Sequence, residues 1–90
     1  MGRWSLGFTR SAEEDLAQLD RPVRRRIIDK LEWLSAHFDG IIPSALHAEF
    51  REFYKLRVGD WRVVYKIEWR KYSIMICYID RRDRVYKKGR

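Results

Sequence analysis

Two arginines and a lysine in the second half of the chain have the side-chain chemistry and the spacing to bind a phosphate group. Gly59-Asp60 predicts a two-residue hairpin turn with glycine in first position. Counting outward from this turn predicts four facing pairs: Val58 with Trp61, Arg57 with Arg62, Leu56 with Val63, and Lys55 with Val64. Facing like charges destabilise a sheet, so Arg57 and Arg62 either splay into water or bind an anion between them. Guanidinium groups suit phosphate because they donate two parallel hydrogen bonds.

A second basic cluster occupies residues 80–88, where five of nine residues are Lys or Arg. The candidate RNA-binding side chains are Arg81, Arg82, Arg84, Lys87 and Lys88, interleaved with two acids and with Tyr86. A tyrosine among arginines can stack on an unpaired base while the guanidinium groups hold the flanking phosphates. Basic tails are common, so the weight of this cluster comes from its position after a predicted central strand.

The remaining reactive side chains do not form a recognisable site. His37 and His47 lack zinc-like spacing, Cys77 lies in an apolar strand, and no acidic cluster resembles a magnesium or manganese site. We therefore expect no metal and no other cofactor. The four tryptophans, of which Trp33 is one, are expected to serve packing rather than base stacking.

The first half of the chain predicts a strand and two helices. Apolar residues alternate from Trp4 to Phe8, as in a half-buried strand. Ser11 and Glu14 have the spacing of a capping box and predict a helix start. Asp20 and Pro22 predict the start of a second helix, which ends at Asp39-Gly40. Its apolar face consists of Val23, Ile27, Leu31, Leu34 and Phe38. Residues 41–50 are expected to form a loop or a short turn.

The second half predicts strands. From Glu52 the apolar residues recur with a period of two on both sides of the Gly59-Asp60 turn. The segment from Tyr72 to Ile79 is apolar almost throughout, which predicts a central strand covered on both faces. A last short strand is expected to include Val85 and Tyr86.

A helical hairpin followed by a run of strands indicates an α+β fold. We expect a single domain spanning residues 1–90, in which the N-terminal strand and the antiparallel helical hairpin pack on a four- to five-stranded, mostly antiparallel sheet. The other face of the sheet should be open and concave and carry the polar residues of the strands. A hydrophobic content of 46% supplies one modest core without disulfides.

The basic charge is concentrated in the second half of the chain. Residues 1–50 carry 7 Lys/Arg and 8 Asp/Glu, a net charge of −1, whereas residues 51–90 carry 13 and 5, a net charge of +8. This asymmetry is typical of a nucleic-acid-binding protein, although a basic surface can also serve solubility alone. With one cysteine, no signal-peptide pattern and no apolar run of about 20 residues, we expect a soluble, cytoplasmic protein that does not enter a membrane.

Two segments resemble motifs of a known superfamily. Residues 54–65, Tyr-Lys-Leu-Arg-Val-Gly-Asp-Trp-Arg-Val-Val-Tyr, resemble the central hairpin of the RelE/ParE toxins of type II toxin–antitoxin systems. Residues 79–86, Ile-Asp-Arg-Arg-Asp-Arg-Val-Tyr, resemble their C-terminal motif, which often reads I-D-H-R-x-x-V-Y. Together with the helical hairpin, the resemblance covers nearly the whole chain and implies the RelE-like microbial ribonuclease fold.

The RelE-like branch implies a metal-independent endoribonuclease that cuts mRNA in the decoding site of the ribosome and is neutralised by a cognate antitoxin in a hetero-oligomer. Carried over by motif, the catalytic residues are Lys55, Arg57, Arg62, Arg82 and Tyr86. Arg81 stands where many relatives have histidine, so no histidine base is available at that position.

Two other functions remain open on the sequence alone. ParE-like members of the superfamily share the fold and inhibit DNA gyrase without cutting nucleic acid. A plain nucleic-acid-binding module would also explain the basic half of the chain.

Overall fold

The computed structural model describes residues 4–47 and 50–85 as one α+β domain. In chain order its elements are β1 (Ser5–Phe8), α1 (Arg10–Ala17), α2 (Arg21–His37), the short 3-10 helix η1 (Phe38–Gly40), β2 (Ser44–His47), β3 (Phe50–Val58), β4 (Trp61–Glu68), the 3-10 helix η2 (Trp69–Lys71) and β5 (Ser73–Arg81). The five strands form one sheet in the order β1-β5-β4-β3-β2. Only β1 and β5 are parallel, so the predicted fold class and mostly antiparallel sheet are confirmed.

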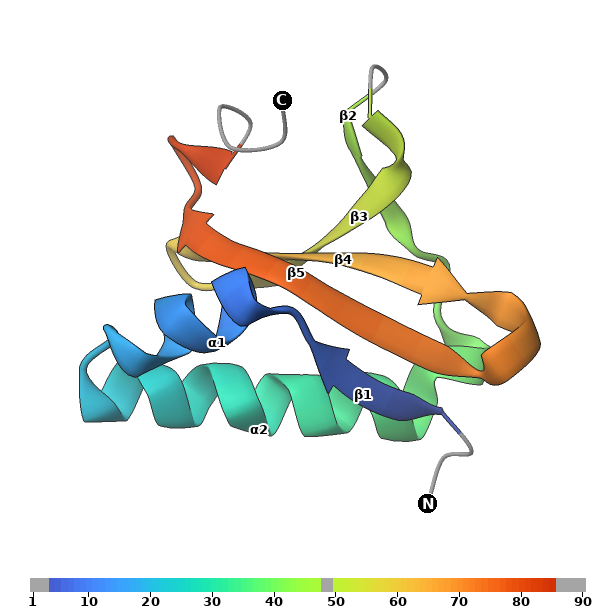
Figure 1. Cartoon of the computed structure of the whole chain (residues 1–90), viewed down its shortest axis with the longest axis horizontal. Coiled ribbons are helices and arrows are strands. Elements are labelled where there is room, and N and C mark those ends of the chain that lie inside the picture. The colour runs from blue at the N-terminus through green and yellow to red at the C-terminus, as the bar shows by residue number, and fades with distance from the viewer. Residues whose placement is uncertain (1–3, 48–49, 86–90) are drawn as a thin grey trace.

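Both helices lie on one side of the sheet and run in opposite directions (Figure 1). The apolar face predicted for the second helix is confirmed, because Ile27, Leu31, Leu34 and Phe38 are buried while Val23 is half-buried. These side chains pack against residues on the helix side of the sheet, among them Val63, Tyr65, Ile74 and Ile76. This is the main core.

The N-cap of the first helix lies two residues before Ser11, the N-cap of the predicted capping box. Thr9 is the N-cap, and its hydroxyl oxygen accepts a hydrogen bond from the backbone N–H of Ala12 at 3.1 Å. The same hydroxyl donates to the carbonyl oxygen of Cys77 at 2.7 Å. Ser11 lies inside the helix, so the predicted capping box is wrong. The contact with β5 selects Thr9 over Ser11, and no local pattern could reveal that contact.

The α1 helix also closes the exposed edge of β5. β1 pairs with β5 only as far as Ile76, which leaves the backbone beyond it without a strand partner on that side. The Asp15 carboxylate accepts a hydrogen bond from the backbone N–H of Ile79 at 2.9 Å. Bonds of this kind satisfy a sheet edge that would otherwise recruit another chain.

The segment predicted as a loop, residues 41–50, contains a strand. β2 pairs with β3 through Ser44 opposite Lys55 and Ala45 opposite Tyr54, with an irregularity in register before His47. Leu46 is buried on the face of the sheet away from the helices. The strand is short and irregular, and it depends on β3 rather than on a period of its own, which is why its sequence resembles a loop.

The central strand is confirmed as β5, which begins one residue later and ends two residues later than predicted. The register shifts between Val64/Tyr65 on β4 and Tyr78/Ile76 on β5, which leaves Cys77 as an extra residue in a β-bulge. Side chains before and after the bulge therefore face both sides of the sheet without strict alternation. This explains the continuous apolar run from Tyr72 to Ile79.

The face away from the helices, called here the open face, is only partly polar. Leu46, Val64, Tyr78 and Val85 form a second buried cluster there, with Phe53 and Cys77 packed against it. The prediction that this face carries the polar residues of the strands is therefore wrong at its centre. In Figure 1, β2 and the start of β3 rise from the sheet on this side.

The last predicted strand is also wrong. Residues 82–84 form a turn and Val85 is helical and fully buried in the second cluster. Burial of Val85 against the sheet face therefore takes the place of strand pairing. Tyr86, the other residue of that predicted strand, lies outside the described residues.

Candidate functional site

The site is organised by the tight turn between β3 and β4. Gly59 has a φ of 58°, a left-handed conformation that glycine adopts without strain, and a Cβ atom at this position would lie 2.8 Å from Nη2 of Arg26. All four predicted pairs are confirmed, including Arg57 opposite Arg62 and Lys55 opposite Val64. The turn thus sets the two arginines side by side on neighbouring strands.

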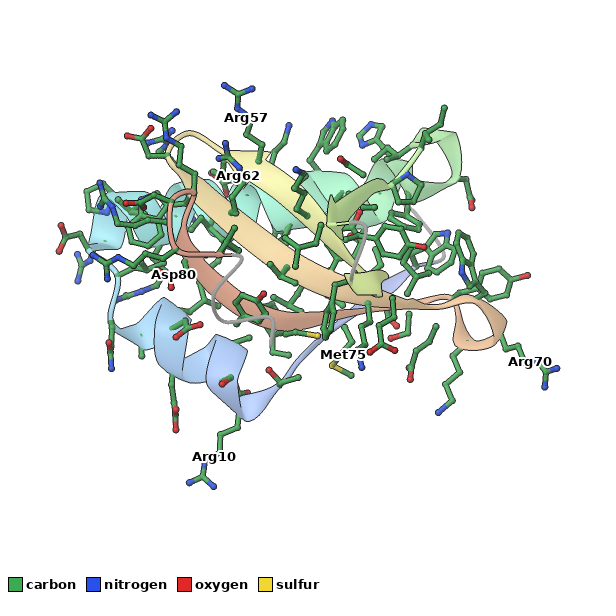
Figure 2. All side chains as sticks on the ribbon, turned by 90° about the horizontal axis from the view of Figure 1, so that it is seen from above. Arg10, Arg57, Arg62, Arg70, Met75 and Asp80 are labelled. Atoms are coloured by element: carbon green, nitrogen blue, oxygen red, sulfur yellow. The ribbon has the colours of Figure 1, made fainter. Side chains whose placement is uncertain are left out.

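Lys55, Arg57 and Arg62 share the open face. Their chain neighbours Leu56, Val58 and Val63 pack in the core beneath the helices, and side chains alternate across a strand. Figure 2 shows Arg57 and Arg62 extending from the same end of the sheet. Arg57 is exposed, whereas Lys55 and Arg62 are half-buried. The predicted hairpin cluster is therefore brought together.

Arg62 is held in place by the turn itself. Its Nη1 donates to the carbonyl oxygens of Gly59 and Trp61, both at 2.9 Å. The other nitrogen atoms of this guanidinium group have no partner among residues 4–47 and 50–85, and neither does the guanidinium group of Arg57. The guanidinium group of Arg62 is therefore already oriented before a ligand binds, which reduces the side-chain conformational entropy lost on binding.

Asp80 adds a carboxylate next to the arginine pair, which the sequence reasoning missed. It faces Arg62 across β4 and β5, and its Oδ1 accepts a hydrogen bond from the backbone N–H of Arg81 at 2.7 Å. The row Arg57, Arg62, Asp80 thus crosses three strands. No signal could have given this position, because the connection between β4 and β5 has no fixed turn type and β5 contains a bulge.

The second basic cluster divides between the two sides of the sheet. Arg81 faces Trp61, and its guanidinium carbon lies 5.4 Å from the centroid of that ring, on the helix side. The backbone N–H of Arg82 donates to the carbonyl oxygen of Asp60 at 2.9 Å, which attaches the residues after β5 to the β3–β4 turn. A small pocket of about 220 Å³ lies here, between Asp60 and residues 81–83. Arg82 and Arg84 are exposed, whereas Lys87 and Lys88 lie outside the described residues.

A buried hydrogen bond anchors the segment after β5 to the open face. The Tyr78 hydroxyl donates to the carbonyl oxygen of Val85 at 3.0 Å. Burial raises the pKa of Tyr78 to about 12, with a further contribution from nearby Cys77 and Asp80. The hydroxyl therefore stays protonated at neutral pH and keeps this bond. Val85 directly precedes Tyr86 of the C-terminal motif in the sequence.

The surroundings of two groups, the half-buried Cys77 thiol and the buried Tyr65 hydroxyl, raise their pKa values. Burial raises the pKa of the Cys77 thiol, and burial together with Tyr54 raises the pKa of Tyr65 to about 12. Both groups therefore favour the protonated form at neutral pH. Within the described part of the chain, no three His, Cys, Asp or Glu side chains gather as metal ligands would. None of the described helices combines the length and apolarity needed to cross a bilayer.

The tryptophans differ in their roles. Trp4 is buried and packs edge-on against Phe38 and Trp69, as expected for packing. Trp33 on α2 is 42% exposed and stacks against His37 of the same helix. It lies outside the apolar face of α2.

Comparisons with known proteins agree with this architecture. The family described as ParE toxin of type II toxin–antitoxin system, parDE, matches residues 6–86. A search of curated proteins finds no match. Among solved structures, the toxin–antitoxin complex RelBE2 from Mycobacterium tuberculosis is similar with a TM-score of 0.78 and 23% identity, covering 91% of this chain and 94% of that chain.

Two further solved structures come from different toxin systems. A mutant of the E. coli toxin RelE in the free state has a TM-score of 0.76 and 22% identity, covering 99% of this chain and 95% of that chain. The chromosomal ParDE system from P. aeruginosa has a TM-score of 0.66 and 20% identity, covering 87% and 95%. At these identities the likeness establishes the fold. The family match spans nearly the whole sequence, and the chain therefore belongs to the ParE toxin family of type II toxin–antitoxin systems, within the RelE/ParE superfamily.

Proposed function

We propose that this toxin is a metal-independent endoribonuclease that cuts mRNA in the decoding site of the ribosome and so inhibits translation. The observation that carries the proposal is the facing pair Arg57 and Arg62 on the open face, with Lys55 two residues away. Two guanidinium groups on neighbouring strands can hold one phosphate between them. An inhibitor that acts only by binding a protein does not need this arrangement.

The proposed reaction is attack by the 2′-hydroxyl group of RNA. A bond forms between O2′ and phosphorus, the bond between phosphorus and O5′ breaks, and the products are a 2′,3′-cyclic phosphate and a 5′-hydroxyl group. The reaction needs a base for the 2′-hydroxyl proton, cations for the phosphorane and an acid for O5′. Every group it requires can come from the protein, since guanidinium and ammonium groups supply the positive charge.

The roles follow from the positions of the side chains. Arg57 and Arg62 would hold the scissile phosphate, and the carbonyl-anchored Arg62 would be the principal ligand. Lys55 or Tyr86 would take the 2′-hydroxyl proton. Arg82 would stabilise the leaving oxygen or help to protonate it, and Tyr86 would also stack on a base. The role of Tyr86 rests on the sequence motif, since this residue lies outside the described residues.

The remaining basic residues would contact the RNA backbone away from the cut. Arg84 lies in the same turn as Arg82, and Lys87 and Lys88 come later in the sequence. We propose that these three residues bind flanking phosphates. Arg81 lies over Trp61 on the helix side of the sheet. RNA that reaches Arg81 would therefore have to pass around the end of the sheet at the β3–β4 turn.

We also propose a cognate antitoxin as the partner of this toxin in a cytoplasmic hetero-oligomer. Support comes from the RelBE2 complex of M. tuberculosis and the RelBE complex of E. coli, which are toxin–antitoxin complexes. The +8 charge of residues 51–90 favours an acidic antitoxin segment that covers the open face or displaces the C-terminal residues. Binding should weaken as salt is raised. An antitoxin that binds only the acidic N-terminal half would contradict this arrangement.

A second candidate function, inhibition of DNA gyrase, is favoured by the name of the matched family and by the likeness to the P. aeruginosa ParDE system. The test is to assay one preparation of purified toxin in parallel on mRNA-programmed ribosomes and on gyrase-driven DNA supercoiling. We expect mRNA cleavage and unimpaired supercoiling. Impaired supercoiling with intact mRNA would establish the gyrase alternative, and no effect in either assay would leave only nucleic-acid binding.

A further inference from the structure

A pocket of about 520 Å³ adjoins the arginine pair at the outer edge of β3. β2 begins at Ser44, opposite Lys55, so among the described residues no strand pairs with Leu56–Val58 on that side. Helix α2 and residues 41–44 form the other walls. The pocket volume lies within the range of small-ligand sites, roughly 300–1,000 Å³. The unpaired edge therefore opens into a cavity large enough for one nucleotide.

The walls of this pocket combine positive charge with apolar surface. Its cations are Lys30, Lys55, Arg57 and Arg62, and the described residues that line it include no carboxylate. A second, adjoining pocket shares Lys30, Trp33 and Arg57 and adds Arg26 and Asp29. Clustered cations favour an anionic ligand. Because Arg57 and Arg62 belong both to the pocket and to the open face, the two sites are continuous.

An exposed aromatic ring stands at the edge of the pocket. The Trp33 indole contacts two side chains of its own helix, with Nζ of Lys30 at 4.1 Å from the ring centroid and the His37 ring at 5.1 Å in a stacked orientation. Ile42, across the pocket, is 93% exposed. His37 is also exposed, so a base can replace its ring against the indole without disturbing the core. Neither Trp33 nor Ile42 contributes to the buried core, so a role in ligand contact explains both.

We propose that this pocket is a subsite for one nucleotide of single-stranded RNA, adjacent to the nucleotide that is cut. Its base would pack against Trp33 and Ile42, and its phosphate would lie between Lys30 and Arg57. Stacking surfaces beside cations are the usual means of holding single-stranded RNA. The proposal deepens the proposed function by extending the RNA path from the open face over the edge of β3 to α2. An acidic peptide could use the same cations, and the test separates the two ligands.

The test uses purified toxin and a fluorescein-labelled, single-stranded 2′-O-methyl RNA hexamer, which cannot be cut. Fluorescence anisotropy at several salt concentrations gives the Kd and its salt dependence for wild type, Trp33→Ala, Trp33→Phe and Lys30→Gln. Arg70→Gln is the charge-matched control, since Arg70 lies at the opposite end of the sheet from Arg57 and Arg62 (Figure 2). Thermal melts of each variant verify that the fold is retained.

We expect Trp33→Ala to weaken binding roughly tenfold with an unchanged salt dependence, and Trp33→Phe to restore part of the loss. Lys30→Gln should lower the slope of log Kd against log salt by about 0.7, because one phosphate contact is lost. Arg70→Gln should keep the wild-type slope. Wild-type hexamer affinity in both Trp33→Ala and Lys30→Gln would overturn the subsite, and so would no hexamer binding by the wild type. Loss of antitoxin affinity alone in these variants would assign the pocket to a protein partner and also overturn the proposal.

The hexamer-binding test of the subsite and the cleavage test of the nuclease can give different answers. On programmed ribosomes Trp33→Ala should raise the KM several-fold and leave kcat close to wild type, because Trp33 lies outside the reacting groups. Cleavage by the wild type with no effect of Trp33→Ala in either assay would leave the nuclease proposal standing without the subsite. Weaker hexamer binding by Trp33→Ala in a toxin that cuts nothing would leave the subsite standing without the nuclease.

Discussion

At the scale of single residues, Arg57 and Arg62 face each other but are held differently. Arg62 is fixed by two carbonyl oxygens of the turn, whereas Arg57 is exposed and has no such anchor. We expect Arg62→Ala to slow single-turnover cleavage on programmed ribosomes about a hundred- to a thousandfold, because one preorganised charge at the phosphorane is lost. Arg57→Ala should slow cleavage less and raise the melting temperature slightly, since it relieves the cross-strand repulsion. Equal losses in the two variants would show that anchoring does not distinguish them.

The Tyr78 hydroxyl is a second residue with a specific expected effect. It donates a buried hydrogen bond to the Val85 carbonyl oxygen, and Val85 fills the second cluster. Tyr78→Phe keeps the ring and removes this bond, which should cost about 1 kcal/mol of unfolding free energy in urea denaturation. We also expect slower cleavage, because this bond holds Val85, which precedes Tyr86 of the C-terminal motif in the sequence. Unchanged cleavage in Tyr78→Phe would separate the anchor from the chemistry.

At the scale of elements, the β3–β4 hairpin was predictable from sequence because its information is local. Gly59 fixes the turn, and the alternation from Tyr54 to Ile67 fixes which side chains face the helices. Lys55, Arg57 and Arg62 were placed together for this reason. Other features depend on residues that are distant in the sequence. Pairing with β3 stabilises β2, and the N-cap Thr9 is held by its hydrogen bond to the Cys77 carbonyl oxygen. Val85 is buried against Tyr78 and Leu46. No local pattern encodes these contacts, and the same is true of Asp80 opposite Arg62.

The hairpin turn requires a left-handed backbone conformation at Gly59, and this requirement can be tested by substitution. Gly59→Ala forces an alanine into a left-handed conformation and brings its Cβ atom to 2.8 Å from Nη2 of Arg26. The guanidinium group is flexible and can move, so the backbone conformation dominates the cost, at about 1–2 kcal/mol. Gly40→Ala is the matched control, because a Cβ atom there meets nothing within 4 Å. Urea denaturation should show a loss in Gly59→Ala and little change in Gly40→Ala. Equal stabilities of the two variants would refute the requirement for glycine in the turn.

At the scale of the whole molecule, two buried tyrosines predict sensitivity to alkaline pH. Burial raises the pKa of both Tyr65 and Tyr78 from 10.0 to about 12. A raised pKa of this kind contributes stability that is complete below pH 10 and is lost as pH rises towards 12, because the unfolded chain releases its protons first. Each tyrosine should account for roughly 2–3 kcal/mol of this loss. Unfolding free energies measured between pH 8 and 11.5 should fall steeply in wild type and less steeply in Tyr65→Phe. A flat profile in wild type would contradict the assignment.

The charge distribution at this scale connects the fold to the proposed activity. Residues 1–50, with a net charge of −1, supply the helices that support the sheet. Residues 51–90, with a net charge of +8, supply the hairpin, the central strand and the residues that follow it. RNA would therefore meet the hairpin end of the open face, and the proposed nucleotide subsite would extend its path over the edge of β3 to α2. The superfamily fold alone does not distinguish a nuclease from a gyrase inhibitor. The two functions must be distinguished by what the side chains at the hairpin end of the open face do.

Primer extension is the direct test of whether the residues at the hairpin end of the open face, Arg57 and Arg62 among them, cut mRNA during translation. Total RNA is taken after brief induction of the wild-type toxin or of Arg62→Ala, and the 5′ ends of one well-translated mRNA are mapped with and without its start codon. We expect new 5′ ends inside the reading frame for the wild type, none when the start codon is removed, and few for Arg62→Ala. Intact mRNA in cells that the wild-type toxin has arrested, or equal cutting by Arg62→Ala, would contradict this expectation.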